Sequence, residues 1–164
     1  MTAQISEELI YQGKTLTLCS EPLGPFLKYS ASPFKFYANC TALWRGYVGT
    51  WSIQADRLYL VKLAGTVQTD DGTIKPVGLV DLFPNFPEGV FAHWFTGLMR
   101  CPDGALLHYV HGGYYSTYER DVFFHVEKGI VLAQCTQING QAEPGALQHY
   151  TLAGMTTFGT PPQN

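Results

Sequence analysis

Charged residues are scarce in this chain of 164 residues: Asp, Glu, Lys and Arg make up 14% of it, against about 25% in a typical soluble domain. This scarcity excludes a long charged helix or a coiled coil, and an aromatic content that is also 14% excludes intrinsic disorder. The formal net charge of −3 leaves no basic surface for a nucleic-acid backbone, so no nucleic-acid partner is expected.

Several familiar segments and motifs are missing as well. The chain begins without a basic and apolar leader, and no apolar run approaches the ~20 residues that cross a bilayer, so we expect a cytoplasmic protein with no membrane partner. The nucleophile elbow, the P-loop and the dinucleotide-binding glycine motif are absent, and no C-x-x-C pair supports a zinc knuckle. We therefore expect no cofactor and four reduced thiols, with two disulfides as the alternative in an exported chain: Cys19, Cys40, Cys101 and Cys135.

What the chain does contain is alternation of period two, which is typical of β-strands. Short polar or glycine-containing breaks between the alternating runs predict hairpins. The predicted pairs are residues 45–53 with 57–63, 90–100 with 105–111 around a turn at 101–104, 114–127 with 130–138, and a weaker pair, 10–11 with 15–19.

Helix signals are few, limited to a turn at residues 6–8 and a short helix at 77–83 that Pro84 ends. We predict a mainly β fold: a single antiparallel β-sandwich or partly open β-barrel with one or two short helices. Residues 1–164 form one domain in this prediction, with a core at about 10–138 and a loosely packed tail at 139–164.

Three motifs occur in a familiar order: W-R-G-Y at residues 44–47, F-A-x-W-F-T-G at 91–97 and Y-E-R-D at 118–121. Together they resemble a group of small bacterial β-rich proteins of unknown function, over roughly residues 10–137. The resemblance implies one compact bacterial domain, and it implies no activity, cofactor or catalytic residue.

Two carboxylates share one face of the predicted strand 114–127. Glu119 and Asp121 would lie about 7 Å apart, a spacing used in glycoside hydrolysis, and His125 follows on the same face. These three are the candidate catalytic residues. A solvated outer face of a half-buried strand explains the same pattern, and we favour that interpretation.

The arginines lie in unusually apolar company. Arg120 falls on the face of the same strand that carries aromatic side chains, where a guanidinium must be paired or stacked. Arg45 and Arg100 are similar cases. Each could bind a carboxylate or phosphate on a ligand, or could bridge strands through carbonyls or an internal carboxylate.

Three histidines, His93, His108 and His111, raise the possibility of a metal site. Residues three apart on a strand point to opposite faces, so His108 and His111 could not both ligate one ion without a bend at 112–113. We expect no metal.

Ten tyrosines exceed what a core of this size readily buries, and several flank Gly112 and Gly113. Aromatic side chains and arginines with few charges are typical of interaction sites. The favoured hypothesis is a non-enzymatic protein-binding module of a bacterial cytosol, such as an immunity or accessory factor, whose partner is another protein or a second copy. The alternative is a β-barrel that binds, or a hydrolase that cleaves, a small anionic or carbohydrate ligand with Glu119, Asp121 and Arg120. The candidate binding residues are Arg45, Arg120, Tyr115, Tyr118, Trp94 and His111.

Overall fold

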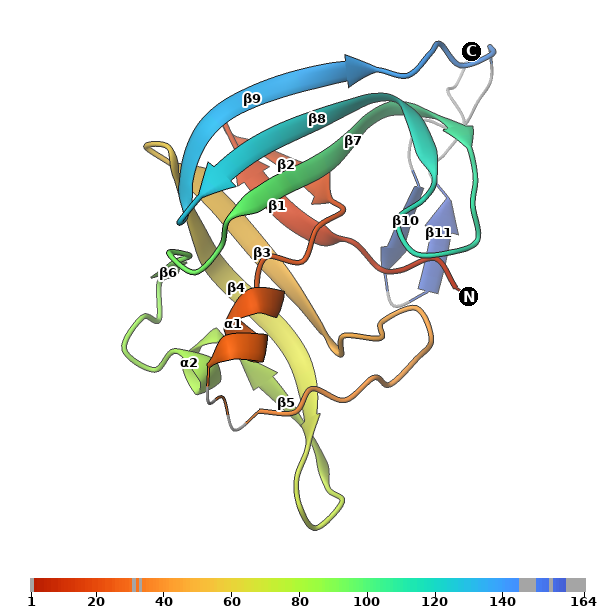
Figure 1. Ribbon diagram of the computed structural model, residues 1–164. Coiled ribbons are helices and arrows are strands. Elements are labelled where there is room, and N and C mark those ends of the chain that lie inside the picture. The colour runs from red at the N-terminus through yellow and green to blue at the C-terminus, as the bar shows by residue number, and fades with distance from the viewer. Residues whose placement is uncertain (1, 31, 33, 145–149, 154, 159–164) are drawn as a thin grey trace.

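The computed structural model describes residues 2–30, 32, 34–144, 150–153 and 155–158, the last two ranges as backbone only (Figure 1). The chain is mainly β with two short helices, which confirms the predicted fold class. The elements are β1 Glu7–Tyr11, β2 Lys14–Leu18, α1 Gly24–Tyr29, β3 Tyr47–Gln54, β4 Arg57–Gln68, β5 Ile74–Gly78, α2 Leu79–Leu82, β6 Val90–Phe91, β7 Gly97–His108, β8 Thr117–Glu127, β9 Ile130–Ile138, β10 Tyr150–Ala153 and β11 Met155–Phe158.

Nine of these strands form one sheet in the order β2-β1-β3-β4-β9-β8-β7, with β5 and β6 also paired to β4. All described pairs in it are antiparallel except β1 and β3, which run parallel with Leu9 opposite Trp51. The sheet is therefore mixed, a correction to the purely antiparallel sheet that we predicted.

The sheet curls so that its two ends approach each other without closing into a barrel. Figure 1 shows β7, β8 and β9 side by side, arching over β1 and β2. Just beyond β2, the backbone N–H of Cys19 donates to the carbonyl of Arg100 in β7 at 2.8 Å. The core fills the space inside this curl, and its largest fully buried side chains are Trp51 and Phe124.

Three of the predicted hairpins are present, and their turns have the backbone conformation that two-residue hairpin loops need. Positive φ angles occur at Gln12 and Gly13 between β1 and β2, at Ala55 and Asp56 between β3 and β4, and at Lys128 and Gly129 between β8 and β9.

The predicted hairpin of residues 90–100 with 105–111 is wrong. Residues 101–104 lie inside β7, which continues to His108 and pairs with β8 instead. Gly104 has a φ of +86° and coincides with a register shift after Asp103, so this glycine forms a bulge rather than a turn. The preceding segment, β6, pairs with β4, so His93 does not lie opposite His108.

The two helices agree only in part with those predicted from the sequence. The predicted helix at 77–83 is α2, shortened because Val77 belongs to β5. Helix α1 was missed, because Gly24 and Pro25 indicated a connection, whereas Pro25 occupies the first turn of the helix, where a missing N–H costs nothing.

The first residues of the predicted tail are attached to β8. Asn139 donates its backbone N–H to the Glu119 carbonyl at 2.8 Å and its side-chain amide to the Tyr118 carbonyl at 2.9 Å. Residues 145–149, 154 and 159–164, which the prediction also assigned to a loose tail, lie outside the described residues.

Candidate functional site

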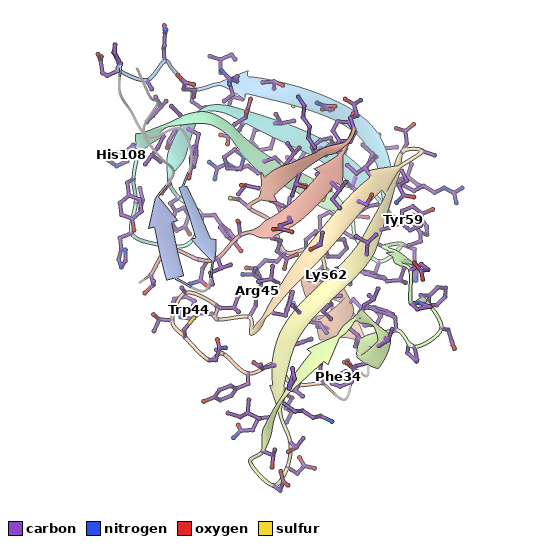
Figure 2. The ribbon with its side chains drawn as sticks, turned by 180° about the vertical axis from the view of Figure 1, so that it is seen from behind. Phe34, Trp44, Arg45, Tyr59, Lys62 and His108 are labelled. Carbon is purple, nitrogen blue, oxygen red and sulfur yellow. The ribbon has the colours of Figure 1, made fainter. Side chains whose placement is uncertain are left out.

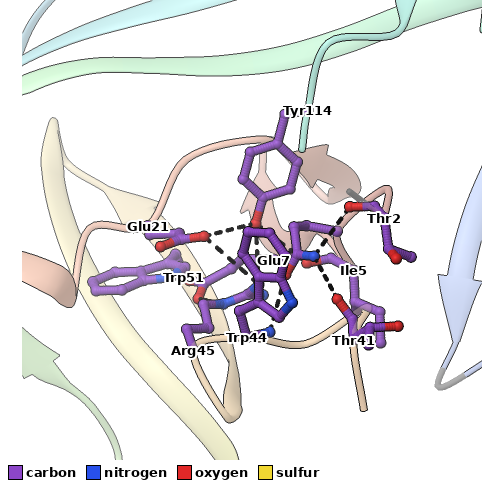
Figure 3. Close-up of polar contacts among 10 residues, drawn as sticks. Thr2, Ile5, Glu7, Glu21, Thr41, Trp44, Arg45, Trp51 and Tyr114 are labelled. Carbon is purple, nitrogen blue, oxygen red and sulfur yellow. Dashed lines mark hydrogen bonds and ion pairs between the residues drawn. The ribbon is translucent and has the colours of Figure 1, made fainter. Parts of the chain in front are cut away.

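A buried network of charged and aromatic side chains connects three parts of the chain (Figure 3). Glu7 of β1 is fully buried and accepts hydrogen bonds from Arg45 Nε at 3.0 Å and from the indole N–H of Trp51 at 2.5 Å. The Arg45 side chain is only 7% exposed and also lies over the ring of Tyr47. An ion pair at this depth offsets part of the desolvation of the two charges and adds little stability.

Burial is the dominant electrostatic influence on Glu7. It raises the pKa of the Glu7 carboxyl from 4.5 to about 7, although the Arg45 charge and the hydrogen bonds from Trp51 and Arg45 act in the opposite direction. Gly49 is required beside this group, since a Cβ there would lie 2.8 Å from both Glu7 Oε2 and Trp51 Nε1. The absence of a side chain at position 49 thus leaves room for the Glu7 carboxyl group beside β3.

Tyr114, in the loop before β8, joins this network to the surface. Its hydroxyl accepts a hydrogen bond from Arg45 Nη1 at 3.1 Å and lies 3.2 Å from the Ile5 carbonyl and 3.1 Å from Glu21 Oε1. Burial raises the pKa of the Tyr114 hydroxyl well above its usual value, so the hydroxyl stays protonated. The loop is thereby fixed to the N-terminal segment.

A second arginine fixes the same loop from the other side. Arg100 of β7 donates Nε to Asp121 Oδ1 at 2.7 Å, Nη1 to the Tyr114 carbonyl at 2.6 Å and Nη2 to the Ser116 carbonyl at 2.9 Å. Ser116 accepts the backbone N–H of Val110 at 3.0 Å. Two guanidinium groups therefore hold a loop that sequence alone presents as a flexible glycine pair.

Around this loop lies a set of exposed aromatic side chains, which we call the aromatic patch: Trp44, Tyr109, His111 and Tyr115. Tyr115 is 69% exposed and Trp44 is 56% exposed. The segments that carry them are linked through Gln4, whose backbone N–H donates to the Gly113 carbonyl and whose side-chain Oε1 accepts the backbone N–H of Trp44. Figure 2 shows Trp44 projecting outward while the adjacent Arg45 points into the fold. Tyr109 and His111 are joined by a 2.8 Å hydrogen bond.

The candidate binding residues do not all lie on this surface. Tyr115 and His111 belong to the aromatic patch, whereas Arg45 and Tyr118 are buried and support it from inside. Arg120 lies, as expected, on the side of β8 that also carries the buried Tyr118 and Phe124, and it is paired there. Its side chain is nevertheless 39% exposed, and its partner at 2.9 Å is the exposed Asp103.

Trp94 belongs to a different region. Its indole N–H donates to the Pro22 carbonyl at 2.9 Å, and its ring stacks on Phe83 and packs on Phe26. A shallow groove of about 320 Å³ beside it is lined by Pro25, Phe26, Tyr29, Ser30 and Trp94. Trp94 is thus a half-buried residue that anchors α1 to the sheet.

Two of the three candidate catalytic residues, Glu119 and Asp121, are engaged in structural contacts. Glu119 accepts the backbone N–H groups of Ala105 at 3.0 Å and Ala142 at 2.9 Å, and these bonds lower the pKa of its carboxyl. Asp121 was predicted on a solvated face but is only 6% exposed, bound by Arg100 and by the Asn139 amide at 2.8 Å. His125 shares a face of β8 with Asp121, but its own side chain is exposed.

Two further hollows occur in the described part of the chain. One, beneath the loop that contains Gly113, has a volume of about 40 Å³, which is room for only a water molecule or two. The other is a groove of about 250 Å³ between the β1–β2 hairpin and β7 to β9, with an apolar floor that includes Leu16 and Val122. Its polar lining comprises Tyr11, Gln12, Lys14, Asp103 and Gln134.

Glu7 was not identified from the sequence, and Trp44 was included only as part of the W-R-G-Y motif. The segment at 6–8 indicated a helical turn, yet period-two alternation from Glu7 to Tyr11 would have placed Glu7 on the same face as the buried Leu9. An acidic residue at a core position of a strand is the signal that was available.

No protein-family model, no curated protein and no solved structure matches this chain. Neither described helix has the length and apolarity that a bilayer-crossing helix needs. Over the described residues, no three His, Cys, Asp or Glu side chains are grouped so that they could hold a metal ion.

Proposed function

We propose that this protein is a non-enzymatic protein-binding module of a bacterial cytosol, an immunity or accessory factor that recognises another protein through the aromatic patch. The observation that carries the proposal is the exposure of Tyr115 and Trp44 beside a loop that Arg100 and Arg45 hold in place. Tyrosine and tryptophan are the side chains that most often dominate binding energy at protein interfaces.

The hydrogen bonds that fix the loop also support a role of the aromatic patch in binding. A loop whose carbonyls at Tyr114 and Ser116 are already bound by Arg100 loses little conformational entropy when a partner docks. The buried charges then have a role, since they position the aromatic patch. The carboxylates that could have served catalysis, Glu119 and Asp121, hold backbone and side-chain partners instead, which favours binding over chemistry.

Site-specific photocrosslinking tests this proposal. A benzoylphenylalanine residue replaces Tyr115, Trp44 or, as a control, Tyr29, which is 79% exposed on α1. In a bacterial lysate, positions 115 and 44 should capture the same protein, and position 29 should not. The purified partner should then bind the Tyr115→Ala variant at least about tenfold more weakly than the unaltered protein, with no change for Tyr29→Ala. Capture that is equal at all three positions, or undiminished affinity of Tyr115→Ala, would contradict the proposal.

A second candidate function rests on the groove of about 250 Å³, where the Lys14 ammonium, the Asp103 carboxylate and the Gln134 amide line one hollow with Tyr11. This set of donors and acceptors fits a small anionic or carbohydrate ligand, with Arg120 acting through its ion pair to Asp103. Addition of such ligands should shift NMR signals of Gln134 and Tyr11, and Gln134→Ala should abolish those shifts. Signals that move only elsewhere would remove the groove from consideration.

A further inference from the structure

The outer edge of β9 lacks a described neighbour along most of its length. On its inner side β9 pairs with β8 from Ile130 to Ile138, apart from a bulge at Leu132. On its outer side it meets β4 only at Ile130, opposite Arg57, and through the Val131 N–H bound to the Asp56 carbonyl. From Leu132 to Ile138 every residue is exposed. Figure 1 shows β9 as the outermost strand of its layer, and no strand among the described residues pairs with this stretch.

The hydrogen-bond register shows which backbone groups face outward. The N–H of Asn139 donates to the Glu119 carbonyl, so position 139 faces β8. Because orientation alternates along an antiparallel pair, residues 133, 135 and 137 also face β8. The N–H and C=O groups of Gln134, Thr136 and Ile138 therefore point away from the sheet.

A bulge interrupts β9 at Leu132, and from Ala133 to Ile138 the edge carries none of the features that normally prevent strand pairing. Proteins protect exposed edges with charged side chains, proline or local bulges. The stretch Leu-Ala-Gln-Cys-Thr-Gln-Ile at 132–138 contains no charged residue, no proline and no glycine. Two of its apolar side chains, Leu132 and Ile138, are 55% and 68% exposed.

We propose that β9 pairs antiparallel with β9 of a second copy of this chain, about a twofold axis at Cys135, so that the sheet continues from one subunit into the other. This register places Gln134 of one copy opposite Thr136 of the other, both with outward-facing backbone groups. It also places Leu132 opposite Ile138 at each end of the interface.

A second copy fits this edge because the strand is complementary to itself. An uncharged strand brings no like charges together when it pairs with its own copy, and a twofold interface repeats each favourable contact. The neighbouring symmetric register, centred on Thr136, would instead oppose Gln134 with Ile138 and leave both apolar side chains mismatched. Centring on Cys135 also brings the two exposed thiols face to face at a pair that is not hydrogen bonded, where Cα atoms lie about 4.5 Å apart.

The test measures association of the full chain by sedimentation over a wide range of protein concentration. The average mass should double as concentration rises. Thr136→Pro removes an outward N–H without removing a hydrogen bond to β8, so it should abolish the rise in mass while circular dichroism shows an intact fold. Thr136→Lys keeps the N–H and adds a charge to the edge, so it should also give a monomer and covers the case in which the proline variant does not fold.

The thiols report the register. In a Cys40→Ser background, a short bismaleimide should join two chains through Cys135, and the product should disappear in Cys135→Ser and in Thr136→Lys. Sedimentation of Cys135→Ser should still show the dimer, since the pairing uses the backbone. A monomer at every concentration, a dimer that persists in both Thr136 variants, or crosslinking that does not depend on Cys135 would each overturn the proposal.

Discussion

Asp121 accepts the Nε of Arg100 at 2.7 Å, and the same guanidinium binds the carbonyls of Tyr114 and Ser116. One carboxylate in the middle of β8 thus orients the side chain that fixes the loop preceding β8. The Asn139 amide on Asp121 Oδ2 extends this arrangement to the segment that follows β9. This carboxylate, predicted as a catalytic candidate, is therefore part of a structural junction beneath the aromatic patch.

Removal of Asp121 should destabilise the protein strongly. Asp121→Ala leaves Arg100 with an uncompensated charge in a mostly buried place, and such losses cost about 3 kcal/mol. Asp103→Ala is the matched control, because its ion pair with Arg120 is largely exposed and should cost less than about 1 kcal/mol. Urea unfolding of the two variants checks the difference, and equal losses would contradict the assignment of Asp121 to a buried junction.

The Glu7 carboxyl should titrate near neutral pH. The pKa of this carboxyl is about 7 in the folded protein, against an ordinary value of 4.5 that applies to the unfolded chain. Between pH 4.5 and 7 the folded protein therefore binds more protons than the unfolded chain. The contribution to the free energy of unfolding is complete below pH 4.5 and is lost as pH rises through 7. The NMR signal of the Trp51 indole N–H, which binds Glu7, should move with this midpoint.

Glu7→Gln should abolish that titration of the Trp51 signal and flatten the pH dependence of stability over the same window. The indole of Trp94, bound to the Pro22 carbonyl, serves as an internal control that should not titrate with it. A Trp51 signal that titrates unchanged in Glu7→Gln would contradict the assignment.

Glu119 should hold the segment that follows β9 in place. Its two oxygens accept the N–H groups of Ala105 and Ala142, so Glu119→Ala should speed hydrogen exchange at both amides. Mass spectrometry of peptides that cover residues 103–106 and 140–144 measures this. The exposed Glu127→Ala is the control, and equal exchange in both variants would show that Glu119 has no such role.

The four cysteines should divide into two reactivity classes. Cys40 and Cys135 are exposed, whereas burial raises the pKa of the Cys19 and Cys101 thiols to about 12. At about pH 8 a disulfide reagent should label the first two rapidly, while the other two react only on unfolding. Rapid labelling of Cys101, which is 1% exposed, would contradict the described core.

Local chemistry accounts for the parts of the fold that the sequence predicts well. The turns at Gln12-Gly13, Ala55-Asp56 and Lys128-Gly129 lie between alternating runs, and a two-residue hairpin depends only on those few residues. The same reasoning fails at residues 101–104, where Pro102 and Gly104 carry a turn signature. Pairing of β7 with β8 along its whole length outweighs that local preference, and the glycine becomes a bulge.

The scarcity of charge and the abundance of aromatic residues excluded a long charged helix and disorder, and period-two alternation between short breaks predicted a mainly β fold. Only the tertiary structure decided where the few charges go, because their partners are distant in sequence: Arg45 meets Glu7, and Arg100 meets Asp121. It also decided that Tyr118 is buried and Tyr115 exposed, because the curl of the sheet covers one and leaves the other in solvent. Alternation along a strand tells which side chains share a face, but burial depends on what packs against that face.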